Sequence, residues 1–420
     1  MSFLSQFVKR GAATMIGVCM LGWTSVSAAP LSLEEAINMA LENHLDIKMA
    51  ENEQKQAKYE LKSTQGSQGL SVDASNTLYL KKVNDSASTS NSDISLSLPL
   101  YTGGKNEGNV EIAKNDVTIA ELNLLKTKQD VRLKAVTAYL DVIEARKTQE
   151  VAQETVDNYQ MHLDNVKAQY SAGNVAKADV LRSEVELTDA EQTLLKSKNA
   201  YEVAVNTLKN VIRWKSTEPL EFTDEFQYAP FQMAMDESVT FAKNHRPDIT
   251  KYRLAIQSAE KSVDVAAADR KPSIALTAGT SWDSNVFPNP GDTDTFVGIT
   301  SSWNLFDNQI TKSKVKKAEI GVDTAQKELE SQEDEVEVTV KEYYLTMKEA
   351  EKRQNTTQIA INKAKEDYFI AQEKYKVGEG VLLDVIDAQL ALTTARNNYI
   401  QAQYDYATYK AKLENAMGMD

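Results

Sequence analysis

The strongest constraint on the fold is an internal repeat. Gly173 and Gly378 are 205 positions apart, and so are Tyr139 and Tyr344. One offset shared by several landmarks indicates a duplicated chain. Two copies of a unit can build one fold together, so the length of 420 residues does not by itself imply several separate domains.

The charge of the chain bears on whether it can bind nucleic acid. The chain has 47 basic and 61 acidic residues, a formal net charge of -14, and a hydrophobic share of 42%. A strongly acidic chain is poorly suited to bind nucleic acid phosphates, so no nucleic acid partner is expected.

The first 28 residues have the order of a secretory signal peptide. Lys9 and Arg10 precede an apolar stretch, and Val26-Ser27-Ala28 is a small-residue cleavage signature. We therefore predict a signal peptide over residues 1–28. The alternative is an uncleaved membrane anchor, because residues 11–28 carry no charge. The only cysteine, Cys19, lies inside this segment, so the mature chain would have no disulfide.

In two segments, at about 70–100 and about 273–305, apolar residues alternate with small or polar residues, with a period of two. Each contains a polar loop between two runs of about ten residues, which predicts a β-hairpin. Strands of that length suit a tilted crossing of a bilayer. Two hairpins give four strands, which cannot close a barrel alone, whereas three chains would supply twelve.

Each hairpin precedes a very long helical pattern, at about 105–170 and about 309–376. No proline interrupts either run, and about 65 residues would span about 100 Å. Glycine-containing tips follow at about 171–176 and 377–381, and return helices at about 177–213 and 381–417. Two apolar rows on the first long helix indicate neighbours on two sides, as in a tube or bundle.

The predicted organisation is a first repeat at 29–213, a linker at 214–235 and a second repeat at 236–420. We expect a mainly α fold with β structure: a long antiparallel α-helical barrel plus a transmembrane β-barrel formed by a homotrimer, with four strands from each chain.

The chain resembles the outer membrane efflux protein family, also called the TolC family, over essentially its whole mature length. The resemblance rests on Leu31-Ser-Leu-Glu-Glu-Ala36, on Pro99-Leu-Tyr-Thr-Gly-Gly104 with its echo at 304–308, and on the two tips. The second tip, Tyr375-x-x-Gly378 followed by Asp384-Val-Ile-Asp387-Ala, is close to the family pattern.

This resemblance implies a homotrimeric conduit in the outer membrane that extends into the periplasm. It implies docking to a periplasmic adaptor (membrane fusion) protein and an inner-membrane transporter, in an efflux or type I secretion system. It assigns Asp384 and Asp387 to the channel entrance, and Tyr375 and Asp179 to links that close the entrance. Gly380 replaces a link-forming arginine of the family, and Ala178 replaces a polar partner, so these links are expected to be weaker or built from other residues.

The residues themselves support part of this assignment. Asp384 and Asp387 are three positions apart and share a helix face, so a trimer would gather six carboxylates that favour cations. The alternative is a pair of solvated aspartates. Asp179 has an equally simple explanation as an acid stabilised by a helix N-terminus.

Two further sets complete the candidates. The tip glycines Gly173, Gly378 and Gly380 are expected to shape the surface that docks the adaptor. Aromatic residues that flank the hairpins are expected to lie at the membrane interfaces, with ordinary strand packing as the alternative. This aromatic set is Tyr79, Tyr101, Trp282, Phe287, Phe296, Trp303 and Phe306.

The sequence shows no nucleophile–base pattern, phosphate loop or metal-ligand spacing, so we expect neither catalysis nor a cofactor. An exported structural or adhesive coiled-coil protein is the alternative to a conduit. That class would explain export and long helices, but it would not explain two matched hairpins.

Overall fold

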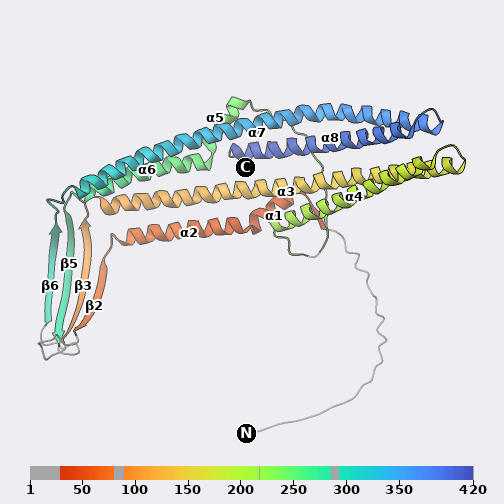
Figure 1. The fold of residues 1–420 in the computed structure, drawn as a ribbon. Helices are drawn as coiled ribbons and strands as arrows, with labels where there is room; N and C mark the ends of the chain where they lie inside the picture. The colour runs from red at the N-terminus through yellow and green to blue at the C-terminus, as the bar shows by residue number, and fades with distance from the viewer. Residues whose placement is uncertain (1–28, 80–88, 217, 285–292, 420) are drawn as a thin grey trace, which may run out of the picture.

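The structure is a computed structural model that describes residues 29–79, 89–216, 218–284 and 293–419. The predicted signal peptide at 1–28 and Phe287 lie outside the described residues. Short helices, a hairpin, a long helix and a return helix follow one another twice along the chain (Figure 1).

The two repeats have helices of identical lengths, which are 11, 22, 67 and 35 residues. The first repeat contains α1 (Leu33–Asn43), α2 (Leu45–Gly66), β2 (Ser71–Tyr79), β3 (Thr89–Tyr101), α3 (Lys105–Ser171) and α4 (Lys177–Val211). The second contains α5 (Met235–His245), α6 (Pro247–Ala268), β5 (Ser273–Ser284), β6 (Thr293–Ser302), α7 (Ile310–Lys376) and α8 (Leu382–Ala416).

The offset between the repeats changes along the chain. Met235 at the start of α5 follows Leu33 at the start of α1 by 202 positions, whereas Ile310 at the start of α7 follows Lys105 by 205. The second hairpin region is therefore three residues longer than the first, and the two helical tips keep the larger offset.

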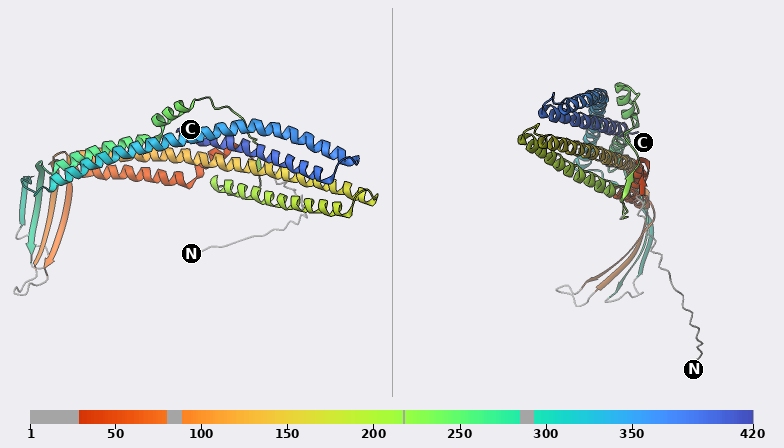
Figure 2. Two further views of the ribbon diagram at one scale, coloured as in Figure 1. Left: turned by 45° about the horizontal axis from the view of Figure 1, so that its top comes forward. Right: turned by 90° about the vertical axis from the view of Figure 1, so that its right-hand side faces the viewer.

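At each of three levels along the molecule, four elements lie side by side as one layer. At every level two elements of the first repeat are followed by the two equivalent elements of the second repeat. The sheet order is β2-β3-β5-β6, with all neighbours antiparallel. Next to the sheet the helices pack in the order α2-α3-α6-α7, and toward the tips in the order α4-α3-α8-α7. Figures 1 and 2 show these helices side by side, with the sheet at one end and both tips at the other. Each layer thus places the two repeats next to each other and leaves an outer edge on each.

The strand register gives the sheet two different faces. Val72 pairs with Leu96, and Leu96 pairs with Ala278, so apolar side chains continue across the strands on one face. The opposite face carries Asp73 opposite Ser95, followed by Gly279. This alternation is what a sheet between an apolar and an aqueous environment requires.

In the part of the chain that the structure describes, no helix combines the length and the apolar composition needed to cross a membrane.

The helices are held by leucine and alanine contacts distributed along their length. Leu187, Leu194 and Leu208 recur at multiples of seven on α4, and all three are buried. The long helix α3 packs against α2, α4, α6 and α8. The apolar rows in its sequence indicated neighbours on two sides, and the packing uses more of its circumference.

A short parallel pair of strands, β1 (Ala29–Leu31) and β4 (Leu220–Phe222), ties the segment between the repeats to the start of the chain. The hydroxyl of Tyr139, which is fully buried on α3, donates to the carbonyl oxygen of Leu31 at 2.9 Å. Burial raises the pKa of this phenol to about 12. Sequence analysis predicted a linker here and did not predict these strands, because three-residue strands carry too few positions to show a period.

Gly108 allows a close approach between the two repeats. A Cβ atom built at Gly108 on α3 would lie 2.5 Å from Cγ2 of Val265 on α6, and α6 belongs to the other repeat. Real Cβ contacts do not reach that distance, so glycine is required for α3 and α6 to pack at this separation.

We therefore predict that Gly108→Ala destabilises the fold by about 1–3 kcal/mol, even though alanine favours helices, because the added methyl group overpacks this contact. Thermal unfolding followed by circular dichroism measures the change. Val265→Ala in the same chain should recover most of the loss, since it removes the clashing atom. No recovery in the double variant would contradict this explanation.

Candidate functional site at the helical tips

Both tips close with the same backbone geometry. Gly173 and Gly378 have φ values of 79° and 81°, which lie in the left-handed region that favours glycine. The next residue then donates its N–H back across the turn, from Asn174 to Gln169 O and from Glu379 to Lys374 O, each at 2.9 Å. This Schellman arrangement satisfies the last carbonyl groups of each long helix and reverses the chain.

Gly380 is constrained by close packing and not by a left-handed backbone. A Cβ atom at this position would lie 3.1 Å from both Cβ of Lys374 and the backbone nitrogen of Tyr375. The N–H of Gly380 also donates to Lys374 O at 3.1 Å. The second tip therefore folds tightly onto the end of α7, and any side chain at position 380 would require its neighbours to shift by a few tenths of an ångström.

Asp179 and Asp384 occupy equivalent positions in the first turns of α4 and α8. The Asp179 carboxylate accepts a hydrogen bond from the N–H of Ala176 at 3.2 Å. Asp179 thus stabilises the start of its own helix, which is the simpler of its two predicted roles. Ala178 beside it is exposed.

Asp384 and Asp387 are both exposed on α8, one turn apart. Asp387 lines a shallow groove of about 480 Å³, whose lining includes Ala360 of α7 and Leu390 of α8. Its charge also contributes to the raised pKa of Tyr159, whose main cause is burial. The two predicted entrance carboxylates therefore share one accessible face close to the tip.

Tyr375 is buried at the end of α7, with 6% of its surface exposed. Its ring lies 5.3 Å from the ring of His162 on α3, which is equally buried. Among the described residues, neither the Tyr375 hydroxyl nor Nε2 of His162 has a hydrogen-bond partner. Burial raises the pKa of Tyr375, with a further contribution from the charge of Asp179. The predicted gating residues Tyr375 and Asp179 thus lie near each other within one chain.

The predicted interface aromatics fall at different levels of the sheet. Tyr101, Trp303 and Phe306 are exposed where the strands meet the helices, and Nε1 of Trp303 donates to Arg270 O at 2.9 Å. Trp282 lies near the other end of β5, on the apolar face. The backbone of Tyr79 ends β2, and its side chain is outside the described part.

Phe296 is the exception among these aromatics. It pairs with Gly279, and Gly279 pairs with Ser95, so Phe296 lies on the polar face of the sheet. A Cβ atom at Gly279 would be 2.9 Å from the Phe296 ring, which shows that the ring covers this glycine. Phe296 therefore lies on the face opposite Trp282, because the strand period turns its side chain to the other side of the sheet, and its place at a membrane interface stays a prediction.

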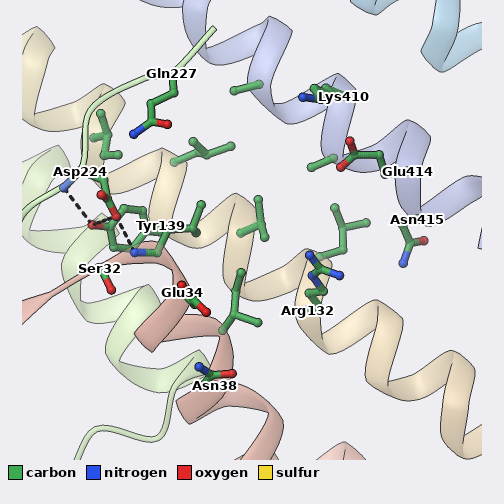
Figure 3. Close-up of a pocket in the computed structure, with 18 of the residues that line it drawn as sticks. Ser32, Glu34, Asn38, Arg132, Tyr139, Asp224, Gln227, Lys410, Glu414 and Asn415 are labelled. Carbon is green, nitrogen blue, oxygen red and sulfur yellow. Dashed lines mark hydrogen bonds between the residues drawn. The ribbon is translucent and has the colours of Figure 1, made fainter. Parts of the chain in front are cut away.

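A second concave region lies at mid-length, where α1, α3, α8 and the segment after β4 meet (Figure 3). This cavity of about 780 Å³ has Arg132, Lys410 and Glu414 in its wall. Burial raises the pKa of Glu414, against the opposing effect of the two cations. In the described part of the chain, no cluster of three or more side chains suited to hold a metal ion occurs.

The fold is that of bacterial outer membrane channel proteins. It superposes on the *Campylobacter jejuni* CmeC outer membrane channel with a TM-score of 0.80 and 18% sequence identity, covering 92% of this chain and 85% of CmeC. The match to VceC from *Vibrio cholerae* has a TM-score of 0.77 and 18% identity, and covers 92% and 96% of the two chains.

The sequence also matches the family model of the outer membrane efflux proteins over residues 36–212 and 240–419, so the chain belongs to that family. It is 23% identical to the alkaline protease secretion protein AprF of *Pseudomonas aeruginosa* and 21% identical to TolC of *Escherichia coli*. These matches cover 69% and 71% of this chain, but only 62% and 64% of the lengths of AprF and TolC.

His162 is the residue at the tips that sequence reasoning missed as a site component. It is one of three histidines in the chain, and the sequence analysis gave it no role. Its position three residues after Tyr159 and one before Leu163, both buried, is the signal that it shares their apolar face.

The buried state of His162 predicts a dependence on pH. Burial lowers its pKa from 6.5, so the unfolded chain binds a proton at a higher pH than the folded tip does. Protonation of this histidine therefore leaves the free energy of unfolding unchanged above about pH 6.5. Below that value the free energy of unfolding decreases, by at most about 1.4 kcal/mol per pH unit for each chain.

Melting temperatures at pH 7.5 and pH 5 test this prediction. Replacing His162→Phe should reduce the difference between the two temperatures, whereas His245→Gln, at an exposed histidine, should leave it unchanged. An equal pH dependence in the His162→Phe variant would rule out this histidine as the cause.

The left-handed conformation of Gly378 predicts a second local effect. Gly378→Ala should weaken the tip by about 1–2 kcal/mol, because an L-residue is disfavoured at φ 81°. Gly378→Asn should cost less, since asparagine tolerates this region. Hydrogen exchange of the amides that donate to Lys374 O reports the change, and faster exchange in the asparagine variant than in the alanine variant would contradict it.

Proposed function

We propose that this protein is the outer membrane exit duct of a tripartite efflux or type I secretion system. In this proposal a homotrimer spans the outer membrane with its sheets and extends its helices into the periplasm. It conducts substrates passively and is not an enzyme. Family membership and the channel fold support this proposal, and the open edges of the layers carry the argument for assembly.

The edges of all three layers are open in a single chain. β2 and β6 each pair with one neighbour only, and α4 packs extensively only against α3 in the described part of the chain. Unpaired strand edges are not tolerated in the interior of a bilayer. Joining β6 of one chain to β2 of the next would remove these edges, and three chains would close a barrel of twelve strands.

The strand dimensions fit this placement. The four strands have 9 to 13 residues, which gives about 30–40 Å along each strand and a smaller height when tilted. One face is apolar and the other polar, so the apolar face suits lipid and the polar face suits an aqueous lumen. The partner at this end of the molecule is outer membrane lipid.

The tips suit the entrance of such a duct. They lie at the end opposite the sheet (Figure 1). Asp384 and Asp387 are exposed on α8 beside the second tip. A trimer would gather six carboxylates around its axis and favour cations at the entrance. The tip surface around Gly173, Gly378 and Gly380 is then the docking surface for a periplasmic adaptor, which connects the duct to an inner-membrane transporter.

An adhesive coiled-coil protein is less consistent with these features. The long helices alone would suit that class, but it has no use for a four-stranded sheet with one apolar face. The match of both repeats to the efflux protein family also favours the conduit.

Conductance of the purified protein in planar bilayers tests the proposal. We expect discrete steps and a preference for cations in a KCl gradient. The variant Asp384→Asn/Asp387→Asn should keep the steps and shift the reversal potential toward zero, because the entrance loses its charge.

The matched control is Glu42→Gln/Glu237→Gln, which removes two exposed carboxylates of α1 and α5 away from the tips. Its reversal potential should equal that of the unmodified protein. An equal shift in both variants would assign selectivity to overall charge rather than to the tip, and absence of steps from inserted protein would disprove the conduit.

A further inference from the structure

The two repeats meet within one chain along a contact between α3 and α8, which we call the inner seam. Near the tips, Nδ2 of Asn158 on α3 donates to Oε1 of Gln389 on α8 at 3.2 Å. Further from the tip, the Arg396 guanidinium of α8 forms an ion pair with Glu154 of α3. An amide hydrogen bond and an ion pair thus hold this part of the inner seam.

The repeat relates α3 to α7 and α8 to α4, because the lengths are 67 and 35 residues in both halves and the offset is 205. The helices that form the inner seam therefore have counterparts at the open edges. If copies of the chain meet as the repeats do, α7 of one copy contacts α4 of the next, which we call the outer seam.

The burial of equivalent residues supports an outer seam on the α4 side. Ile386 and Ile400 of α8 are 5% and 6% exposed. Their counterparts on α4, Leu181 and Leu195, are apolar but 52% and 70% exposed. Equivalent apolar side chains are thus buried on α8, which packs against both α3 and α7, and exposed on α4.

The α7 side shows the same contrast. Leu140 of α3 is 7% exposed, whereas its counterpart Leu345 of α7 is 60% exposed. Exposed leucines at positions that are buried in the other repeat indicate a missing neighbour of the same shape. A second copy of this chain supplies that neighbour.

The polar contacts of the inner seam can be transferred by the same offset. Asn158 and Gln389 correspond to Lys363 and Glu184, so a neutral amide pair becomes a pair of opposite charges. Lys363 is exposed and forms no ion pair with another described residue. The Glu184 side chain on α4 is 44% exposed and forms an ion pair at 3.1 Å with Lys167 on α3 of the same chain.

The ion pair of the inner seam does not transfer. Glu154 and Arg396 correspond to Ile359 and Glu191, which are not complementary. The opposite charges of the outer seam therefore lie nearer the tip, by one turn on the long helix and by two turns on the return helix. Their polarity is reversed, with the base on the long helix and the acid on the return helix.

We propose that the outer seam is held next to the tip by an ion pair between Lys363 of one copy and Glu184 of the partner subunit. This inference rests on the homotrimer of the proposed function and names the residues that join its copies. The Lys363–Glu184 ion pair makes the outer seam more sensitive to salt than the inner seam, where an amide hydrogen bond lies at the same level, because exposed ion pairs are screened.

Disulfide trapping tests the register of the outer seam. The hydroxyls of Thr155 and Thr393 lie 3.1 Å apart across the inner seam, and the counterparts of these residues are Ala360 and Thr188. Ala360→Cys/Thr188→Cys should therefore form disulfides between copies and give covalent dimers and trimers on a non-reducing gel. The background is clean, since the only other cysteine is Cys19 in the predicted signal peptide.

Two controls fix the interpretation. Thr155→Cys/Thr393→Cys should form a disulfide inside one chain and leave the covalent mass unchanged. Lys352→Cys/Thr188→Cys, displaced by two turns, should remain unlinked. A trimer by light scattering in which Ala360→Cys/Thr188→Cys stays unlinked would overturn the inference and leave the proposed function intact. A monomer would overturn both.

Charge reversal tests the ion pair itself. Lys363→Glu should lower the temperature at which trimers dissociate in detergent and reduce the dependence of that temperature on NaCl. Lys363→Glu/Glu184→Lys should restore a higher temperature than Lys363→Glu alone. Asn158→Asp, a charge change at the same level of the inner seam, should leave the salt dependence of dissociation in place. An unchanged salt dependence in Lys363→Glu would disprove the pair.

Discussion

The rest of the structure depends on the incomplete hydrogen bonding of a four-stranded sheet. Among the described residues, β2 and β6 each leave one row of backbone donors and acceptors without a strand partner, and in lipid such groups cost several kcal/mol each. The helices also lack neighbours at these edges, because Leu181 and Leu345 are exposed whereas their counterparts in the other repeat are buried. Both deficits occur at the same two edges of the molecule, so one assembly step can remove them together.

The sequence predicted the helices well and the contacts between them poorly. Both long helices lie within one residue of their expected ends, because proline-free runs and tip glycines are unambiguous signals. The β1–β4 pair was missed because its strands are three residues long. The position of Phe296 on the polar face depends on pairing register, and hydrophobicity alone does not specify that register.

At the tips the sequence identified the right residues but not their surroundings. Glycine at 173 and 378 could be predicted from turn chemistry. That Tyr375 packs on His162 could not, because the two residues are more than two hundred positions apart and come from different repeats. The tight packing of Gly380 against Lys374 likewise becomes visible only when the turn is built. Glycine at this position, where the family resemblance implies an arginine, is compatible with that close contact.

The continuity of α3 and α7 has a mechanical consequence. Each is a single helix of 67 residues that begins beside the sheet and ends at a tip, so it acts as a lever about 100 Å long. A tilt of one degree at the sheet end moves the tip by about 1.7 Å over that length. A small rotation of either helix about its sheet end is therefore amplified into a displacement of ångströms at the tip.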